Sequence, residues 1–399
     1  MIKNIEQPTT FTFLNKYDIL VLSHLRWGFV YQRPQHLLSR FAKHTRVFFF
    51  EEPIFHDQEH KLHIAKGSDN VYTVIPYIKH GTVEQDVIEQ QKKFLNNLVS
   101  LMNIERYVSW YYTPMALPFT DHLTPSSVVY DCMDELSNFK FAPPILKILE
   151  EKLFQKANVV FTGGYSIYEA KKNKHKNIHA FPSSIDKHHF EQARKLTNDP
   201  SDQADIPSPR FGFYGVVDER FDIDLIREAA TARPEWQFII IGPVVKIDPE
   251  TLPKNKNIHY LGGKSYQELP EYLAGWDIAI IPFAINDSTK FISPTKTPEY
   301  LAAGKPVIST PIRDVVSPYG DNELLHIASN AEEFIACAEA ELVKEDREKW
   351  LTQVDNFIAT NSWDKTWSLM AGLIEHSLRT NTDTAIKYLY EDFAKKEAI

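Results

Sequence analysis

The stretch SPTKTPEYLAAGKPVIST, residues 293–310, decides the fold. It predicts a loop, a short helix and a buried strand. Thr297 is a suitable N-cap, and Pro298 suits the first helical position because the N–H that proline lacks would be unpaired there. Gly304 stands where a left-handed residue commonly ends a helix. The apolar Pro-Val-Ile run that follows reads as the strand.

The start of this predicted helix is a candidate anion site. Unpaired N–H groups and the positive end of the helix dipole meet there. Lys296, just before the helix, would add a point charge for a phosphate. Glu299 is not three residues after the cap, so a capping box does not explain it. A carboxylate there can accept hydrogen bonds from the vicinal hydroxyls of a sugar, and the alternative is that it only complements the dipole.

The run PEYLAAGKPVI resembles the nucleotide-sugar-binding segment of GT-B glycosyltransferases of the "group 1", family 4 type. In that family two glutamates, separated by seven residues, precede an Ala-rich turn. Glu299 matches the second glutamate, which in the family binds the ribose of the donor. The first would fall at Phe291, so the resemblance leaves contacts to the donor sugar to Asn286, Ser293 or backbone amides. The pattern Ser-Pro-x-Lys-x-x-Glu-Tyr-Leu-Ala is similar to the teichuronic-acid and capsular polysaccharide branch.

Length and composition indicate an ordinary globular protein. A chain of 399 residues suggests two domains, each with its own core. The net charge of −9 argues against a dedicated nucleic-acid binder. Cys132 and Cys337 provide neither a disulfide framework nor a metal cluster, so we expect a reducing cytoplasm. The first eight residues lack the apolar run of a signal peptide, and no apolar stretch is long enough to span a membrane.

Strands and helices alternate through the first half of the chain. An apolar run at 17–23, an amphipathic helix at 33–42 and a buried strand at 46–50 form a βαβ unit, which predicts a parallel sheet. Further strands are expected near 71–75, 107–111, 127–130, 159–162 and 179–182, with helices near 84–101, 144–156 and 166–172.

Loops after these strands are candidates for the acceptor side, because ligands of open α/β sheets lie beyond the carboxyl ends of the strands. Arg26 could hold an anionic group and Trp27 could stack on a sugar. The alternative is an ordinary loop cation beside a packed aromatic. Asp134 is our preferred acidic residue there, although three acids within five positions also suit a solvated helix start. The glycine pair at 163–164 is weak evidence of phosphate binding.

The run PSSIDKHHF, which begins at Pro182, resembles the family's Pro-Asn-Gly-Val-Asp-x-x-x-Phe at the end of the first domain, with two serines in place of Asn-Gly. A polar, proline-containing linker follows. We therefore expect an acceptor-side Rossmann-like domain over 1–194 and a nucleotide-sugar-binding one over 205–362. In this fold the C-terminal helix commonly crosses back, so 363–399 should pack on the first domain.

The second predicted domain opens with a strand that runs into Gly215. Glycine tolerates backbone angles barred to other residues and lets a ligand approach closely. The segment resembles the family's first strand and glycine loop, whose following basic residue meets the donor diphosphate. Arg220 is the matching residue, and a guanidinium fork suits phosphate oxygens. The alternative is a surface ion pair with Glu219 or Asp222.

Further donor-binding residues are expected from the same resemblance. In the family, the turn after the strand near residue 258 lines the pocket for the base, which implicates Leu261 and Lys264. Ser293, Thr295 and Thr297 complete the expected donor-binding set.

The resemblance implies a retaining, hexosyltransferase-type enzyme that uses a nucleoside-diphosphate sugar, with UDP favoured, and needs no metal or other cofactor. Arg220, Lys296 and helix amides would stabilise charge on the leaving diphosphate, and Asp134 is the third catalytic candidate. The expected acceptor is a glycan or lipid-linked molecule of bacterial surface polysaccharide synthesis. The basic run 171–176 or the segment 385–399 could make peripheral contact with a membrane. The alternative is that these segments are solvated helix ends.

Two other functions are compatible with this fold. One is a sugar-nucleotide 2-epimerase, which would show a carboxylate cluster at the anomeric carbon of the donor. The other is a non-catalytic nucleotide-sugar binder, made plausible by Phe291 where the family has a glutamate.

Overall fold

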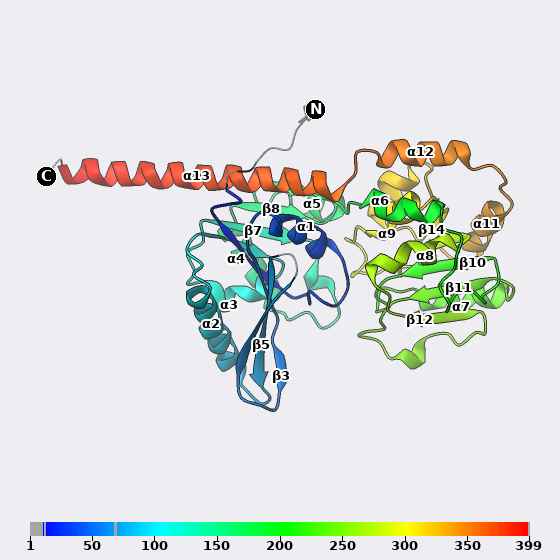
Figure 1. The fold of residues 1–399 in the computed structure, drawn as a ribbon, viewed down its shortest axis with the longest axis horizontal. Helices are drawn as coiled ribbons and strands as arrows, with labels where there is room; N and C mark the ends of the chain where they lie inside the picture. Colours follow the sequence, from blue (N-terminus) through cyan, green and yellow to red (C-terminus); the bar gives the residue numbers. More distant parts are fainter. Residues whose placement is uncertain (1–10, 12, 68–69, 398–399) are drawn as a thin grey trace.

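The computed structural model describes residues 11, 13–67 and 70–397, with side chains as far as Asn381. Two sheets, each flanked by helices, form two lobes, and one long helix runs from the second lobe back along the first (Figure 1). The parallel α/β architecture predicted from the alternation of strands and helices is confirmed.

The first sheet has the strand order β3-β5-β2-β1-β6-β7-β8-β9, and β4 pairs antiparallel with β5 at one side. Its strands are β1 (Asp18–Ser23), β2 (Val47–Glu51), β3 (Ile54–His56), β4 (Lys61–Lys66), β5 (Val71–Lys79), β6 (Tyr107–Tyr111), β7 (Ser127–Cys132), β8 (Val159–Thr162) and β9 (Ile178–Ala180). Strands β2, β6, β7 and β8 are buried along their whole length, as expected of a parallel sheet covered on both faces.

Helices cover both faces of this sheet. They are α1 (Arg33–Ala42), α2 (Glu84–Leu101), α3 (Leu117–Thr120), α4 (Leu146–Lys156) and α5 (Tyr165–Lys171). Apolar residues of α1 form one core cluster with the sheet, while those of α2, α4 and α5 form another. The sheet is therefore the middle of three layers.

The second sheet has the order β12-β11-β10-β13-β14-β15, all parallel. Its strands are β10 (Arg210–Tyr214), β11 (Gln237–Ile241), β12 (Ile258–Gly262), β13 (Ile278–Ile281), β14 (Val307–Ser309) and β15 (His326–Ile327). Its helices are α7 (Ile223–Ala232), α8 (Leu269–Ala274), α9 (Lys296–Ala302), α10 (Arg313–Val315), α11 (Ala331–Leu342) and α12 (Glu348–Ile358).

The predicted cap of α9 is wrong. The helix begins at Lys296, after a turn in which the N–H of Thr297 donates to the carbonyl oxygen of Pro294. Thr297 therefore lies inside the first helical turn, fully buried, and its hydroxyl has no hydrogen-bond partner among the described residues. Gly304 has a φ of +72°, the left-handed conformation that its position predicts.

The chain passes between the lobes twice, at adjacent places. On the way out, short helix α6 (Lys187–Phe190) follows β9, and Phe190 packs in the core of the second sheet. On the way back, Ser184 donates a 2.6 Å hydrogen bond to Asn361 of the returning chain. Arg40 of α1 contacts both passages, since it pairs with Asp186 at 2.5 Å and with Asp364 at 2.8 Å.

Helix α13 (Trp363–Glu397) then packs on the first lobe, as predicted (Figure 1). Trp363, Met370 and Ile374 are fully buried in the core cluster that contains α1. The side chains of the charged segment 385–399 lie outside the described residues. None of the helices described here has both the length and the apolar character needed to cross a bilayer. The predicted domain boundaries at 194 and 205 stay a prediction.

Candidate active site

A cavity of about 540 Å³ lies between the two lobes, where the carboxyl ends of strands from both sheets face each other. From the first lobe it is lined by Trp27 to Arg33, Met133, Asp134, Gly163 and Ser183. From the second it is lined by Tyr214 to Val216, Arg220, Ile241 to Pro243, Gly263 to Gln267, Leu269, Phe283, Ile292 to Lys296 and Glu299. We call this cavity the cleft.

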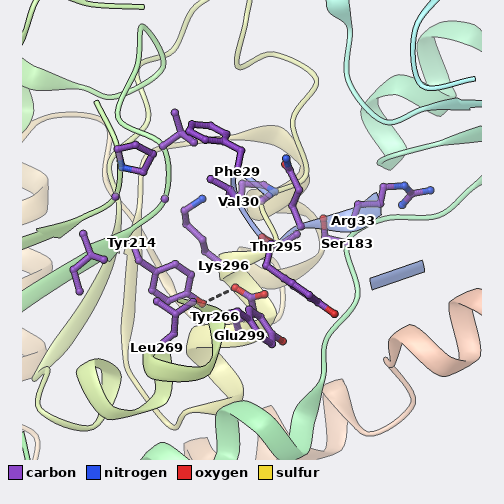
Figure 2. A pocket seen from close by; sticks show the side chains of 18 of the residues that line it. Phe29, Val30, Arg33, Ser183, Tyr214, Tyr266, Leu269, Thr295, Lys296 and Glu299 are labelled. Carbon is purple, nitrogen blue, oxygen red and sulfur yellow. Dashed lines mark hydrogen bonds between the residues drawn. The ribbon is translucent and has the colours of Figure 1, made fainter. Parts of the chain in front are cut away.

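Glu299 of α9 faces the cleft with a fixed orientation. The hydroxyl of Tyr214 donates a hydrogen bond of 2.5 Å to its Oε2 (Figure 2). Tyr214 is held in turn, because its N–H donates to the hydroxyl of Tyr300 at 3.0 Å. Burial raises the pKa of Glu299, while the Tyr214 hydrogen bond and the charge of Lys296 oppose the rise. No described residue donates to Oε1, so this oxygen can accept a hydrogen bond from a ligand.

Lys296, the first residue of α9, reaches into the same part of the cleft (Figure 2). Its Nζ lies 5.3 Å from the ring centroids of both Phe213 and Phe283. Burial and the nearby charge of Arg220 lower the pKa of Lys296. No carboxylate of a described residue lies within ion-pair distance of Nζ. An anion bound here would supply the counter-charge that the protein does not.

Gly215 makes room for this lysine. Its φ of +143° belongs to the region that favours glycine. A Cβ at this position would lie 2.5 Å from Cε and 2.7 Å from Nζ of Lys296. The glycine therefore fixes where the ammonium group can lie.

Arg220 is held by an ion pair with Asp218, a partner not expected from the sequence. Its Nε and Nη2 donate to both carboxylate oxygens of Asp218 at 2.7 to 3.1 Å, instead of pairing with Glu219 or Asp222. Burial opposes its charge, but Asp218 outweighs that effect and raises the pKa of Arg220. Phe139 of the first lobe covers the guanidinium at 5.4 Å. Nη1 is left for a ligand in the cleft.

Asp134 approaches the cleft from the first lobe. Burial raises the pKa of its carboxyl group, and Arg220 and Arg33 oppose the rise. Asp134 and Glu299 are the two carboxylates among the described cleft residues, and they come from different lobes. The cleft therefore has one carboxylate on each wall, with Arg220 and Lys296 on the wall of Glu299 and Arg33 on the wall of Asp134.

Ser293, Thr295 and Lys264 also line the cleft. Ser293 joins the lobes, because the hydroxyl of Ser183 donates to its carbonyl oxygen at 2.5 Å. Lys264 is tied to Asp202 by an ion pair of 2.5 Å, so its charge is already balanced. Leu261 and Thr297 are absent from the lining of the cleft: Leu261 packs against the core of the second lobe, and Thr297 is fully buried.

The structure places the two predicted acceptor-side residues, Arg26 and Trp27, differently relative to the cleft. Arg26 does not line the cleft, since its guanidinium contacts the carboxylate of Glu51 at 3.1 Å and two backbone carbonyls. Trp27 lines the cleft, but its ring packs edge-on against Phe49 with centroids 5.1 Å apart. These contacts match the alternative raised from the sequence, in which Arg26 is an ordinary loop cation and Trp27 is a packed aromatic.

Several cleft residues were not identified from the sequence. Arg33 makes a buried, two-pronged ion pair with Asp131 on β7. Tyr266 stacks on Tyr31 with centroids 4.5 Å apart, joining the lobes at the floor of the cleft. The sequence held one local signal for a cleft residue: Arg33 follows a strand and a loop and begins an amphipathic helix.

Phe291 lies where the resemblance places a glutamate, and it packs against a core cluster of the first lobe. Other contacts between the lobes lie nearby. The amide of Asn138 donates to the carbonyl oxygen of Asp287 at 3.1 Å, and Asp314 accepts a hydrogen bond of 3.0 Å from the N–H of Ser166. The amide end of α5, beside the glycine pair, is thus filled by a protein carboxylate.

The basic run 171–176 is largely paired within the protein. Lys171 is buried and contacts Glu150 at 2.8 Å and Glu135 at 2.7 Å. Lys172 and Lys174 also have carboxylate partners, in Glu169 and Glu151.

The sequence of this chain is similar to those of known proteins. The model of the family "Glycosyl transferases group 1" matches residues 208–344, which hold Gly215, Arg220, Lys296 and Glu299. A protein of Bacillus subtilis (strain 168), provisionally named teichuronic acid biosynthesis glycosyltransferase TuaH, is 25% identical over 287 residues, with 66% of this chain and 70% of that protein covered.

Two solved structures have the same arrangement of lobes. Sucrose-phosphate synthase of Thermosynechococcus elongatus superposes with a TM-score of 0.67 at 13% identity, covering 92% of this chain and 100% of that chain. HepE of Anabaena, in complex with UDP and glucose, superposes with a TM-score of 0.60 at 13% identity, covering 90% and 98%. Residues 208–344 are therefore similar to the group 1 glycosyltransferases, and the chain has the GT-B fold.

Proposed function

We propose that the protein transfers a sugar from a UDP-sugar to a hydroxyl group of a glycan or lipid-linked acceptor, with retention of anomeric configuration, in the synthesis of a surface polysaccharide. One observation carries this proposal: two cations, Arg220 and Lys296, and the oriented carboxylate of Glu299 lie together in one cleft. A nucleoside diphosphate needs both kinds of group, cations for its phosphates and an acceptor for its ribose hydroxyls. The similarity to TuaH supports the polysaccharide, and the UDP and glucose in HepE support the donor.

In this proposal the diphosphate lies against Nη1 of Arg220 and Nζ of Lys296, and the ribose hydroxyls donate to Oε1 of Glu299. During transfer the bond from the anomeric carbon to the β-phosphate oxygen breaks, and its electron pair leaves with UDP. Both cations are in place before this charge develops, so little reorganisation is needed. Contacts between the lobes exclude water and align the acceptor.

The acceptor hydroxyl forms the new bond on the same face of the sugar, and its proton passes to the leaving phosphate. We assign Asp134 the role of accepting a hydrogen bond from that hydroxyl, since it is the carboxylate on the acceptor wall. The donor-binding roles proposed for Ser293 and Thr295 rest on their place beside Lys296. Because both cysteines are unpaired, we propose the cytoplasm as the compartment of the reaction.

Calorimetric titration with UDP tests the proposal. We expect UDP to bind the wild type and to bind Glu299→Ala and Lys296→Ala at least about tenfold more weakly, since a hydrogen bond to a charged group contributes about 1.5–3 kcal/mol. Lys264→Ala, in which the lost charge is one already paired with Asp202, is the control and should lose less. Equal UDP binding by all variants would contradict the assignment of this cleft.

A non-catalytic nucleotide-sugar binder is the second candidate, favoured by Phe291 because this side chain packs between the lobes where the family has a glutamate. Incubation with radiolabelled UDP-sugars and membrane extracts separates the two candidates. Release of UDP that depends on an acceptor supports transfer, whereas tight binding without turnover supports the second candidate.

A further inference from the structure

The loop between β7 and α4 presents an unusual surface at the rim of the cleft. It begins at Asp134, on the acceptor wall, and passes Phe139, which covers Arg220 at 5.4 Å and Lys246 at 5.2 Å. From there it leads to Phe141, Ile145 and Ile148, whose exposed fractions are 79%, 43% and 55%. We call Lys140, Phe141, Ile145, Lys147 and Ile148 together the rim patch.

Phe141 is held in an exposed position by its backbone. Its φ of +69° is in the left-handed region, which is rare and strained for a bulky side chain. Its ring is covered by the ammonium group of Lys140 at 5.2 Å, not by a core. Ile145 and Ile148 are three residues apart at the start of α4, so they share one face of the helix. The inward face of α4, with Leu149 and Leu153, is already buried.

The charge of the rim patch is positive and uncompensated. Among the described residues no carboxylate forms an ion pair with Lys140 or Lys147. Glu151, an exposed acid of α4, is paired with Lys174. The chain as a whole has a net charge of −9, so an anionic surface would repel most of it and attract this part.

We propose that the rim patch docks the protein onto an anionic lipid bilayer, with Phe141, Ile145 and Ile148 in the interface and Lys140 and Lys147 against the headgroups. Exposed apolar side chains beside unpaired lysines are the combination that such an interface binds. A soluble acidic protein would satisfy the lysines, but it would not require three projecting apolar side chains. If the proposed function holds, docking brings the acceptor wall at Asp134 next to lipid-linked acceptors in the membrane.

Co-sedimentation with vesicles tests the docking. We expect the full chain to bind vesicles of phosphatidylglycerol and phosphatidylcholine, to bind pure phosphatidylcholine weakly, and to dissociate as salt is raised. Lys140→Glu/Lys147→Glu should reduce binding at least about tenfold, because each basic residue near a charged membrane surface is worth roughly a fivefold change. Phe141→Ser/Ile145→Ser/Ile148→Ser should also abolish most of the binding.

Matched controls are Leu101→Ser and Val343→Ser, which remove apolar side chains that are 74% and 77% exposed elsewhere on the molecule. These variants should bind vesicles as the wild type does. Equal binding by the rim and control variants, or no preference for anionic vesicles, overturns the proposal. A dimer that the rim variants dissociate, without vesicle binding by the wild type, would show that a second copy covers the patch instead. Vesicle binding requires no donor, and UDP titration of the same variants should be unchanged, so this result is independent of the proposed transfer.

Discussion

The hydroxyl of Tyr214 donates a hydrogen bond of 2.5 Å to Oε2 of Glu299, although the two residues are 85 positions apart in the chain. Both side chains are buried, and burial of a carboxylate favours its protonated form. The hydrogen bond opposes part of the rise that burial causes in the pKa of Glu299, and it fixes one carboxylate oxygen while the other is directed to the cleft. Tyr214 is thus a positioning residue for the proposed ribose contact.

Tyr214→Phe should shift the pH dependence of UDP binding. Because the lost hydrogen bond had lowered the pKa of Glu299, that pKa should rise further in the variant, and the carboxylate should protonate at a higher pH. UDP affinity, measured calorimetrically across the neutral range, should fall about tenfold at the acidic side and recover in part as pH rises. Tyr260→Phe, which removes a 3.1 Å hydrogen bond to a backbone carbonyl and does not line the cleft, should leave the profile unchanged. An unshifted profile in Tyr214→Phe would remove the positioning role.

Lys296→Met and Lys305→Met should have opposite effects on the stability of the fold. Burial lowers the pKa of both ammonium groups, but Lys305 donates to the carbonyl oxygens of Ala274 and Trp276 at 2.9 and 2.7 Å. Lys305→Met should destabilise the fold by about 1–3 kcal/mol, because buried carbonyl groups lose their partner, and should leave UDP affinity unchanged. Lys296→Met removes a buried charge without a partner, so it should raise the melting temperature while lowering UDP affinity. Loss of stability in Lys296→Met would show that the lysine has a structural role.

Gly215→Ala should impair donor binding through Lys296. The added Cβ would lie 2.5 Å from Cε of Lys296, and the positive φ disfavours alanine in any case. The matched control is Gly81→Ala, at a φ of +81° with open space around it. Both variants should lose roughly 1 kcal/mol of stability from backbone strain, but Gly215→Ala alone should lose UDP affinity. Similar titration curves for the two would mean that Lys296 can adapt.

Arg40→Met should lower the stability at neutral pH and weaken the dependence of stability on acid pH. Burial alone would raise the pKa of Asp186, but His36, whose Nδ1 lies 3.2 Å from its carboxylate, and the charge of Arg40 outweigh it and lower the pKa to about 2. A depressed carboxyl pKa adds stability above its unfolded value, near 4, and that stability is lost as pH falls from about 4 to about 2. Without Arg40 the pKa of Asp186 moves back towards its unfolded value, so less of this stability is present at neutral pH and less of it is lost in acid.

Urea denaturation at several pH values measures this effect. At neutral pH the cost of Arg40→Met should be on the order of 2 kcal/mol, since the pair is partly buried. Arg227→Met removes an exposed i,i+3 ion pair with Asp224 and should cost less than about 0.5 kcal/mol. Equal losses in the two variants would contradict a special role for Arg40.

Much of the fold could be predicted because strands buried on both faces are continuous apolar runs. The β1, β2 and β6 runs follow from that pattern, and α2 has the bounds expected from the sequence, 84–101. Strands β3 and β4 were not predicted, because Lys61–Lys66 mixes charged and apolar residues at an edge of the sheet, where one side of the strand faces solvent.

The candidate site was predictable where its residues form local motifs. Gly215, Lys296 and Glu299 each lie in such a motif, and the structure brings them together. Two side-chain partners were not predictable. Arg220 pairs with Asp218 and not with its neighbour Glu219, which depends on the conformation of their loop. Tyr214 meets Glu299 from 85 positions away, which depends on how the strand and the helix approach one another. Thr297 was misassigned because capping patterns fix a helix start only to within one or two residues.

Arg40 joins both segments of chain that connect the lobes, and Ser184 and Asn361 hold those segments against each other. Such a molecule has a single hinge at one end of the cleft. Opening about this hinge would break non-covalent contacts between the lobes, such as the hydrogen bond from Asn138 to Asp287. Donor and acceptor would then enter from the free end, and tightening the hinge would slow product release before it altered the chemistry.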